Sequence, residues 1–292
     1  MMKIAMIGAS LPNLLLATSL THTNTGVDIV CFSTPENLGG VWGPASNRSG
    51  NFRKVPTVLA YKDEAKVRSY FAAMDIDLLE LKGRFINQDL SHGVLYPELI
   101  DYKSRWSDVA ELDSNFVTEI KCAPETNVRV NGREFDFAVI TTRCRLDRIH
   151  SGDLAYDTPY QAIESRYIHA IFSGPPNLSY YEEGVHGLID RYQLVEFRNN
   201  KGRYHLCARI SKGIDEFDLY DSQNFMAVRS IEQMIPSDVW IEYYSDSYRG
   251  ADQQARLEDA CRNNKGLVYF DTKSLASVVE DVIPNLLGLI ND

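Results

Sequence analysis

Gly8, Ser10 and Asn13 stand at the spacing of the three glycines in a G-x-G-x-x-G turn, directly after the apolar run Met2–Ile7. In such a turn a glycine lets the chain reverse after a strand, and the free N–H groups of the following helix face an anionic pyrophosphate. Ser33 ends the next apolar run, where an acid normally holds the ribose of a dinucleotide. These residue types predict a pyrophosphate-binding turn that keeps one glycine and lacks the ribose acid.

A βαβ unit is expected to position this turn. The run Met2–Ile7 predicts the first strand, and Val27–Phe32 predicts the second. Between them, Pro12 fits the start of a helix from Asn13 to Leu20, because the first turn of a helix does not need its missing N–H. Such a unit at the start of the chain favours a nucleotide-binding fold.

A glycine pair follows the second predicted strand. Gly39 and Gly40 allow a close approach of backbone just before Trp42. The segment Val41–Pro56 is rich in Gly, Pro, Asn and Ser, which predicts a long irregular loop of the kind usually tied to a binding site.

In the rest of the chain the predicted secondary structure changes from an α/β pattern to antiparallel strands and then back to an α/β pattern. Up to Arg148 the pattern predicts a helix and several strands, including a hairpin that turns at Asn131-Gly132 and leads into a nearly continuous apolar strand typical of a parallel sheet. From there to about residue 250 the strands read as mostly antiparallel, and the last section returns to an α/β pattern. The predicted elements are Asp63–Met74 (helix), Ile76–Leu81, Asn115–Cys122, Asn127–Phe137 (hairpin), Phe135–Thr142, Tyr167–Phe172, Leu194–Arg198, Tyr204–Ile210, Val239–Tyr244, Ala251–Asn263 (helix), Gly266–Phe270 and Ser274–Ile290 (helix).

The amino-acid composition limits the classes of partner that this protein is expected to bind. The 292 residues carry a formal net charge of −10 without a long run of Lys or Arg, so the chain lacks the positive surface of a nucleic-acid-binding protein. The 5 cysteines form no C-x-x-C pair, and no two histidines have the spacing of a metal site, so no metal is expected. With no room for a signal peptide before the first strand and no apolar run of membrane-spanning length, we expect a cytoplasmic protein that does not bind membranes.

The order of these motifs resembles the FAD-binding group of flavin amine oxidases, phytoene desaturases and UDP-galactopyranose mutases. The first motif is Lys3–Gly8 with its helix, then Val27–Ser33, then Leu38–Trp42. The second is similar to Val117–Ile120 followed by the strand ending at Thr142. The third is similar to Leu267–Asp271 and the helix after it. The first 45 residues match best, and the middle of the chain hardly matches.

The resemblance implies a role for each matched residue. It places Gly8, Ser10 and Asn13 at the pyrophosphate and Ser33 near the adenosine ribose. The remaining cofactor-binding residues that it implies are Gly39, Gly40 and Trp42 at the phosphates or isoalloxazine, Val117 at adenine through its backbone, and Asp271 near the ribityl chain or pyrophosphate. Ser10 and Asn13 add side chains where glycine is usual, and Ser33 lacks the carboxylate that binds a ribose diol.

The fold class that follows is α/β, with a Rossmann-like FAD/NAD(P)-binding domain and an inserted, mainly antiparallel substrate domain. The nucleotide-binding domain is expected to comprise residues 1–60, 110–150 and 251–292, and the substrate or interaction domain residues 61–109 and 151–250. The leading function is an FAD-dependent oxidoreductase acting on a small molecule. The alternative is a non-catalytic relative that serves as a binding or partner protein, as a homodimer or heterodimer. NAD(P) is a third option, which the Leu-Gly-Gly-x-Trp continuation disfavours.

Catalytic residues are not predicted, because a flavin carries the redox chemistry itself. His186 and His205 are candidates for lining a pocket, as are the aromatic pairs Tyr180-Tyr181 and Tyr243-Tyr244 together with Trp240. A structural role in the sheet is the simpler interpretation of each.

Overall fold

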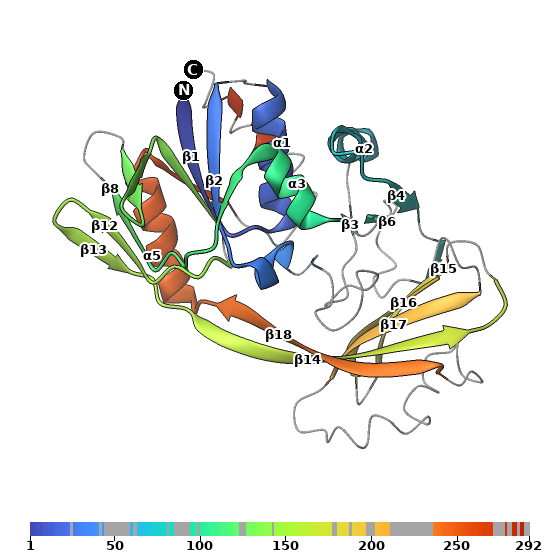
Figure 1. Cartoon of the computed structure of the whole chain (residues 1–292). Helices are drawn as coiled ribbons and strands as arrows, with labels where there is room; N and C mark the ends of the chain where they lie inside the picture. Colours follow the sequence, from blue (N-terminus) through green and yellow to red (C-terminus); the bar gives the residue numbers. More distant parts are fainter. Residues whose placement is uncertain are drawn as a thin grey trace.

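The computed structural model describes most of the two halves of the chain. The described residues are 1–23, 26–40, 43, 59–60, 63–80, 82–84, 94–97, 100–122, 127–141, 143–176, 180–186, 189–196, 202–210, 236–270, 278, 282–284 and 287–288. Figure 1 shows an α/β half containing β1 and α1 above a long antiparallel sheet that contains β14 and β18. The α/β class with an antiparallel second region is therefore confirmed.

A parallel sheet forms the centre of the α/β half. Its order is β19-β11-β1-β2-β7, and every neighbouring pair in it is parallel. The strands are β1 (Met2–Ile7), β2 (Val27–Phe32), β7 (Glu111–Asp113), β11 (Phe137–Thr141) and β19 (Leu267–Phe270). Since all five run the same way, their carboxyl ends meet at one edge, which is where open α/β sheets bind ligands.

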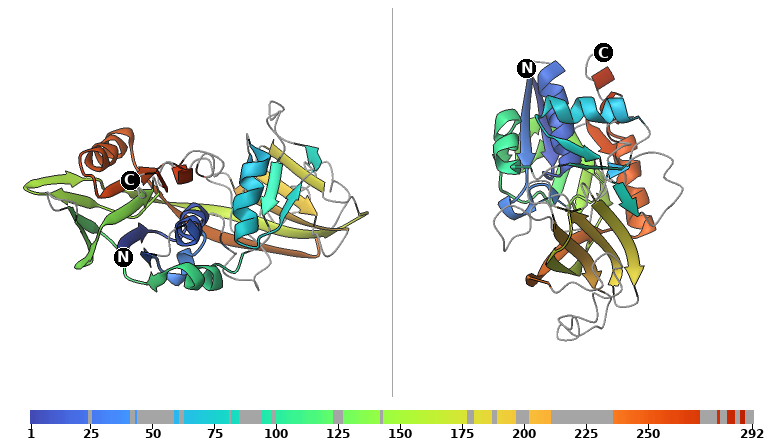
Figure 2. Two further views of the ribbon diagram at one scale, coloured as in Figure 1. Left: turned by 90° about the horizontal axis from the view of Figure 1, so that it is seen from above. Right: turned by 90° about the vertical axis from the view of Figure 1, so that its right-hand side faces the viewer.

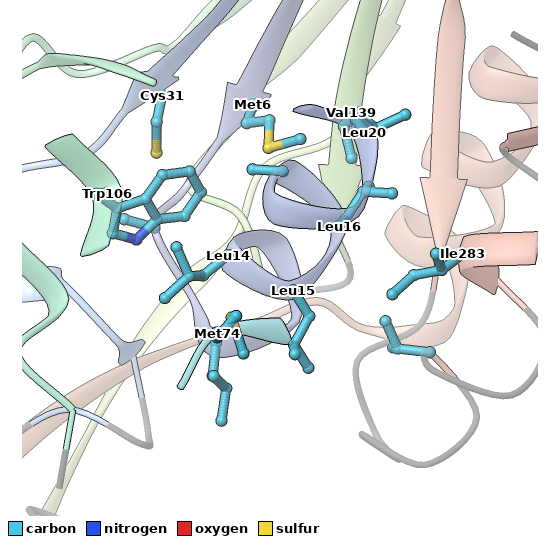
Figure 3. Packing of buried hydrophobic residues seen from close by; sticks show 14 of the residues in the cluster. Met6, Leu14, Leu15, Leu16, Leu20, Cys31, Met74, Trp106, Val139 and Ile283 are labelled. Carbon is cyan, nitrogen blue, oxygen red and sulfur yellow. The ribbon is translucent and has the colours of Figure 1, made fainter. Parts of the chain in front are cut away.

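Helix α1 (Leu11–Thr23) packs on one face of this sheet. Its residues Leu11–Leu20 are all buried, as expected for a helix that is apolar all round. Its hydroxyl groups do not remain unpaired, because Thr18 and Ser19 donate to the carbonyls of Leu14 and Leu15. Figure 3 shows Trp106 on one side of this helix and Ile283 on the other.

Two further helices cover α1. They are α2 (Glu64–Ala73) and α3 (Tyr102–Val109), and their residues Phe71 and Trp106 belong to the same buried cluster as α1. Each begins at an aspartate whose side chain accepts a backbone N–H, at 3.1 Å from Lys66 N in α2 and from Ser104 N in α3.

A second five-stranded sheet and α5 (Ala251–Arg262) cover the opposite face of the parallel sheet. The order is β10-β9-β8-β12-β13. The strands are β8 (Glu119–Cys122), β9 (Val128–Val130), β10 (Arg133–Phe135), β12 (Arg148–Ser151) and β13 (Leu154–Asp157). The bidentate pair between Arg133 and Glu111 joins β10 to the edge strand β7, at 2.6 and 3.0 Å.

The second half is a six-stranded sheet of order β18-β14-β17-β16-β15-β5, which is antiparallel except for the β15–β5 pair. Its strands are β5 (Lys82–Arg84), β14 (Gln161–Ser173), β15 (Tyr180–His186), β16 (Ile189–Glu196), β17 (Arg203–Ile210) and β18 (Asp238–Tyr248). The long strands β14 and β18 extend from the α5 side of the molecule to the α2 side (Figures 1 and 2). A small sheet is formed by β3 (Leu59–Ala60), β6 (Val94–Pro97) and β4 (Leu78–Glu80), and η1 (Pro35–Asn37) follows β2.

Most of the predicted elements are confirmed within one to three residues. The first helix is longer than predicted, since it begins at Leu11 and ends at Thr23. The strand predicted over Asn115–Cys122 begins only at Glu119, and β14, β16 and β18 each extend four to six residues further at one end than predicted. The sequence pattern missed α3 and the strands β3, β5, β6, β7, β12, β13 and β15. The loop Val41–Pro56, apart from Gly43, and most of the terminal helix Ser274–Ile290 lie outside the described residues. The domain limits stay a prediction.

In the part of the chain that the structure describes, no helix combines the length and apolar character needed to cross a membrane. All five cysteines are buried, and none of them forms a disulfide.

Arg249, buried after β18, ties that strand to the α/β half. Its Nε donates to the Thr158 carbonyl at 2.9 Å and its Nη2 to the Leu146 carbonyl at 2.5 Å. We expect Arg249→Met to lower the free energy of unfolding by about 3 kcal/mol. The change removes two hydrogen bonds donated by the charged guanidinium and leaves the two carbonyl groups without that donor. The measurement is urea unfolding, with Arg256→Met on the exposed side of α5 as control. Equal stability of the two variants would contradict the assignment.

Candidate functional site

The first residue of the site is Gly8, at the carboxyl end of β1. Its φ is +98°, a conformation that favours glycine, and its N–H donates to the Phe32 carbonyl of β2 at 2.9 Å. A Cβ added at Gly8 would meet no atom within 4 Å. The glycine is therefore required by the backbone, and the space beside it is not filled by the described protein atoms.

Ser10 caps the helix that follows. Its carbonyl accepts the Leu14 N–H at 3.0 Å, and its Oγ accepts the Asn13 N–H at 3.5 Å. Pro12, in the first turn, has no N–H. Ser10 and Pro12 thus reduce the number of helix N–H groups that an anion could reach.

The buried side chain of Asn13 is hydrogen-bonded to the backbone of the Gly8 turn. Its Nδ2 donates to the Gly8 carbonyl at 2.6 Å, and the same carbonyl accepts the Cys31 Sγ–H at 3.6 Å. The residue is fully buried, and its Oδ1 has no hydrogen-bond partner among the described groups. Burial raises the pKa of the Cys31 thiol, which keeps it a donor. The side chain that replaces a glycine here supports the Gly8 backbone.

We expect Asn13→Asp to lower the free energy of unfolding by about 3 kcal/mol or more. The change turns the donor facing the Gly8 carbonyl into an acceptor and buries a carboxylate. A negative charge in the first helical turn recovers at most about 1 kcal/mol, so the penalty dominates. Asn13→Leu, which is similar in size and uncharged, should cost less. Thermal unfolding of both variants measures the difference, and an Asp variant as stable as the Leu variant would contradict the penalty for a buried carboxylate facing the Gly8 carbonyl.

The pair Gly39-Gly40 packs directly on this turn. The Gly39 N–H donates to the Ala9 carbonyl at 2.7 Å, and Gly39 forms an isolated parallel bridge with Ser10. A Cβ on Gly39 would lie 2.6 Å from the ring of Tyr102, whereas one on Gly40 would be 3.6 Å from the Ser10 Cβ. Both residues have positive φ. The close approach at Gly39 is therefore made by Tyr102 of α3 and by the Gly43 backbone, whose Cα would lie 2.8 Å from that Cβ.

Ser33 directly follows β2 at this edge of the parallel sheet, and Val117 lies between β7 and β8. The Ser33 N–H donates to the Asp113 carbonyl at 2.9 Å, and its Oγ donates to the Thr34 carbonyl at 3.3 Å. Val117 is buried in the cluster under the second five-stranded sheet. Neither is bonded to the Gly8 turn by a contact that the structure describes.

The structure thus brings Gly8, Ser10, Asn13, Gly39 and Gly40 together and places Ser33 at the same edge of the sheet, whereas Val117 is buried under the second five-stranded sheet. Trp42 and Asp271, also predicted to bind the cofactor, lie outside the described residues, as do the side chains of Tyr180, Tyr181 and His186. The sequence pattern missed Tyr102, which packs on Gly39. The aspartate cap three residues before Ser104 was the available signal for its helix.

Comparisons with known proteins give the fold a context. No protein-family model and no curated protein matches this sequence. A reduced UDP-galactopyranose mutase is similar over 100% of this chain and 95% of its own, with TM-score 0.62 and 12% identity. A putrescine oxidase is similar over 100% and 99%, with TM-score 0.61 and 11% identity. An FAD-dependent oxidoreductase from Pseudomonas aeruginosa is similar over 99% and 91%, with TM-score 0.51 and 13% identity.

The chain has the fold of the FAD-binding amine oxidase group. Its resemblance to that group, inferred from the motif order, is confirmed at the level of fold. At about 10% identity the likeness shows the fold alone.

Proposed function

We propose that this protein is an FAD-dependent oxidoreductase that acts on a small molecule. The turn at Gly8 carries the proposal, because its positive φ and open Cβ position leave room for a phosphate group beside the backbone. The fold supports it, since similar structures include a putrescine oxidase and an FAD-dependent oxidoreductase.

The residues at the turn fit a pyrophosphate. Ser10 Oγ accepts one hydrogen bond from the Asn13 N–H, and its own proton is a donor suited to a phosphate oxygen. We assign Ser33 to the adenosine ribose through its hydroxyl. The other residues assigned to FAD are Asn13 as support of the turn, Gly39, Gly40, Trp42, Val117 and Asp271.

When bound, FAD supplies the hydride-accepting chemistry, and the protein supplies binding and orientation. The same residues predict weaker binding than an intact fingerprint gives. Pro12 has no N–H, the Asn13 N–H is bonded to Ser10, and Ser33 offers a neutral hydroxyl in place of a carboxylate. We therefore expect FAD to dissociate during purification and to rebind when added.

The test is the visible absorption spectrum of the purified protein before and after addition of FAD, with the supernatant examined after denaturation. A change in the flavin absorption bands when FAD is added to the protein, and a Tm that rises with FAD concentration, are the expected result. Absence of both at high FAD excess would overturn the proposal.

A further inference from the structure

The six-stranded antiparallel sheet has two different faces. Alternate residues of β14, β16 and β17 form an apolar cluster on one face, as expected for a sheet with a buried side. This cluster consists of Ile168, Ala170, Phe172, Tyr192, Leu194, Tyr204, Leu206, Ala208 and Ile210.

The other face is buried but polar. His169 pairs across the strands with Cys207 and Trp240, and Ile171 pairs with His205, so these side chains share one face. Glu242 lies two residues beyond Trp240 on the same face of β18. His169 is 0% exposed and Glu242 1%, and His205, Cys207 and Trp240 are also buried. Buried histidines and a buried carboxylate destabilise a fold unless they are paired.

This polar face is turned toward the α/β half. At the end of the sheet nearest that half, Tyr243 and Glu164 on the apolar face are exposed, Tyr243 by 51%. Their neighbours on the polar face, Glu242 and Tyr167, are buried. The carboxyl ends of β1 and β2 point toward β14 and β18 (Figures 1 and 2). The covered side of these two strands is thus the side that faces the nucleotide-binding edge.

The two histidine rings are hydrogen-bonded to each other. His169 Nδ1 lies 3.0 Å from His205 Nε2, and His169 Nε2 lies 3.7 Å from the Cys207 Sγ. Since each bond between ring nitrogens needs one donor and one acceptor, one proton lies between the rings. Burial and the nearby Glu242 charge both raise the pKa of Cys207, so it stays a thiol and can donate to His169.

Burial of both rings disfavours a charge on the pair, and two neighbouring groups oppose this for one added proton. The Trp240 ring is stacked on both imidazoles, with centroids 5.1 Å from His169 and 6.0 Å from His205, and an indole face attracts a cation. Glu242 is a buried carboxylate on the same face. A second proton is disfavoured, because two imidazolium rings 3.0 Å apart would repel each other.

We propose that His169 and His205 form a proton-holding site, which binds one proton in the neutral pH range and releases it as a unit. His205, 7% exposed, is the outer ring through which the proton passes, and His169 lies behind it at 0%. An oxidoreductase that takes a hydride from its substrate must also accept a proton. The use of the pair for that purpose rests on the proposed function.

The strand registers place other charged and titratable residues on this face. They are Tyr167 on β14, Arg191 on β16, Arg203, Cys207 and Arg209 on β17, Asp238, Glu242 and Tyr244 on β18, and Tyr181 and Glu183 on β15. Gln193, also on β16, is neutral. Of these, Cys207 is in contact with His169, and Glu242 is a buried carboxylate whose charge acts on Cys207.

The test is NMR of the FAD-free full chain with labelled histidine, titrated from pH 5 to 9. His169→Gln and His205→Gln assign the two ring signals, and exposed His22 serves as the reference histidine. We expect both rings to shift together in one step between about pH 6 and 8, with no second step above about pH 5. Glu242→Gln, similar in size but uncharged, should lower that midpoint by about one pH unit or more, and His22→Gln should leave it unchanged.

Independent titration of the two rings, or no titration at all in this range, would overturn the proposal. A midpoint that does not move in Glu242→Gln would overturn the role of the carboxylate. Because the measurement needs no flavin, its failure is distinguishable from a failure to bind FAD.

Discussion

Gly39→Ala is expected to lower the free energy of unfolding by about 3 kcal/mol. Two effects add. A left-handed conformation, here φ +85°, costs a residue with a Cβ about 1–2 kcal/mol. The new methyl group would also lie 2.6 Å from the Tyr102 ring, and forcing an extra carbon into a packed site costs about 1–3 kcal/mol. Urea unfolding of the FAD-free protein measures the sum.

Gly40→Ala is the matched control for this change. Gly40 also has positive φ, +57°, but an added Cβ there would be 3.6 Å from its nearest neighbour, an ordinary contact. Only the conformational cost of about 1–2 kcal/mol is expected. Placing Gly39→Ala in a Tyr102→Leu background should recover part of the loss, because the two residues are in contact. If the two alanine variants are equally stable, Tyr102 does not pack on the loop.

This difference between the two glycines shows which structural features could be predicted from the sequence and which could not. The βαβ unit was predictable because it depends on local pattern: an apolar run, a glycine, a helix and a second apolar run. The contact of Gly39 with Tyr102 was not predictable, since Tyr102 is distant in sequence and comes from a helix of only eight residues. β7 was missed for a related reason, because its three residues Glu111–Asp113 form a short, charged edge strand.

The histidine pair in the second half of the chain is another contact that the sequence pattern could not predict. His205 could be named as a candidate from its strand, but His169 is 36 residues away and became relevant only through the register of β14 against β17. A shift of one residue would place the two rings on opposite faces. Chemistry that depends on register cannot be read from strand patterns alone.

Gly8→Val is expected to weaken FAD binding about 100-fold or more while the protein still folds. The side chain would enter the open space beside the turn, where nothing lies within 4 Å of the added Cβ, and where we place the pyrophosphate. The protein itself should lose only the cost of positive φ, about 2 kcal/mol for a β-branched residue. FAD titration followed by flavin absorbance gives the affinity, and thermal unfolding without FAD gives the stability.

The variant Gly132→Val separates the loss of FAD binding from the loss of stability caused by backbone strain. Gly132 has φ +81°, and an added Cβ there also meets nothing within 4 Å, but it lies in the turn between β9 and β10. Its substitution should lower stability about as much as Gly8→Val and leave FAD affinity unchanged. Equal flavin affinity in both variants would show that the pyrophosphate does not lie at Gly8. Loss in Gly8→Val alone would place the phosphate beside the one glycine of the fingerprint that this chain retains, because strain is common to both variants and only the location differs.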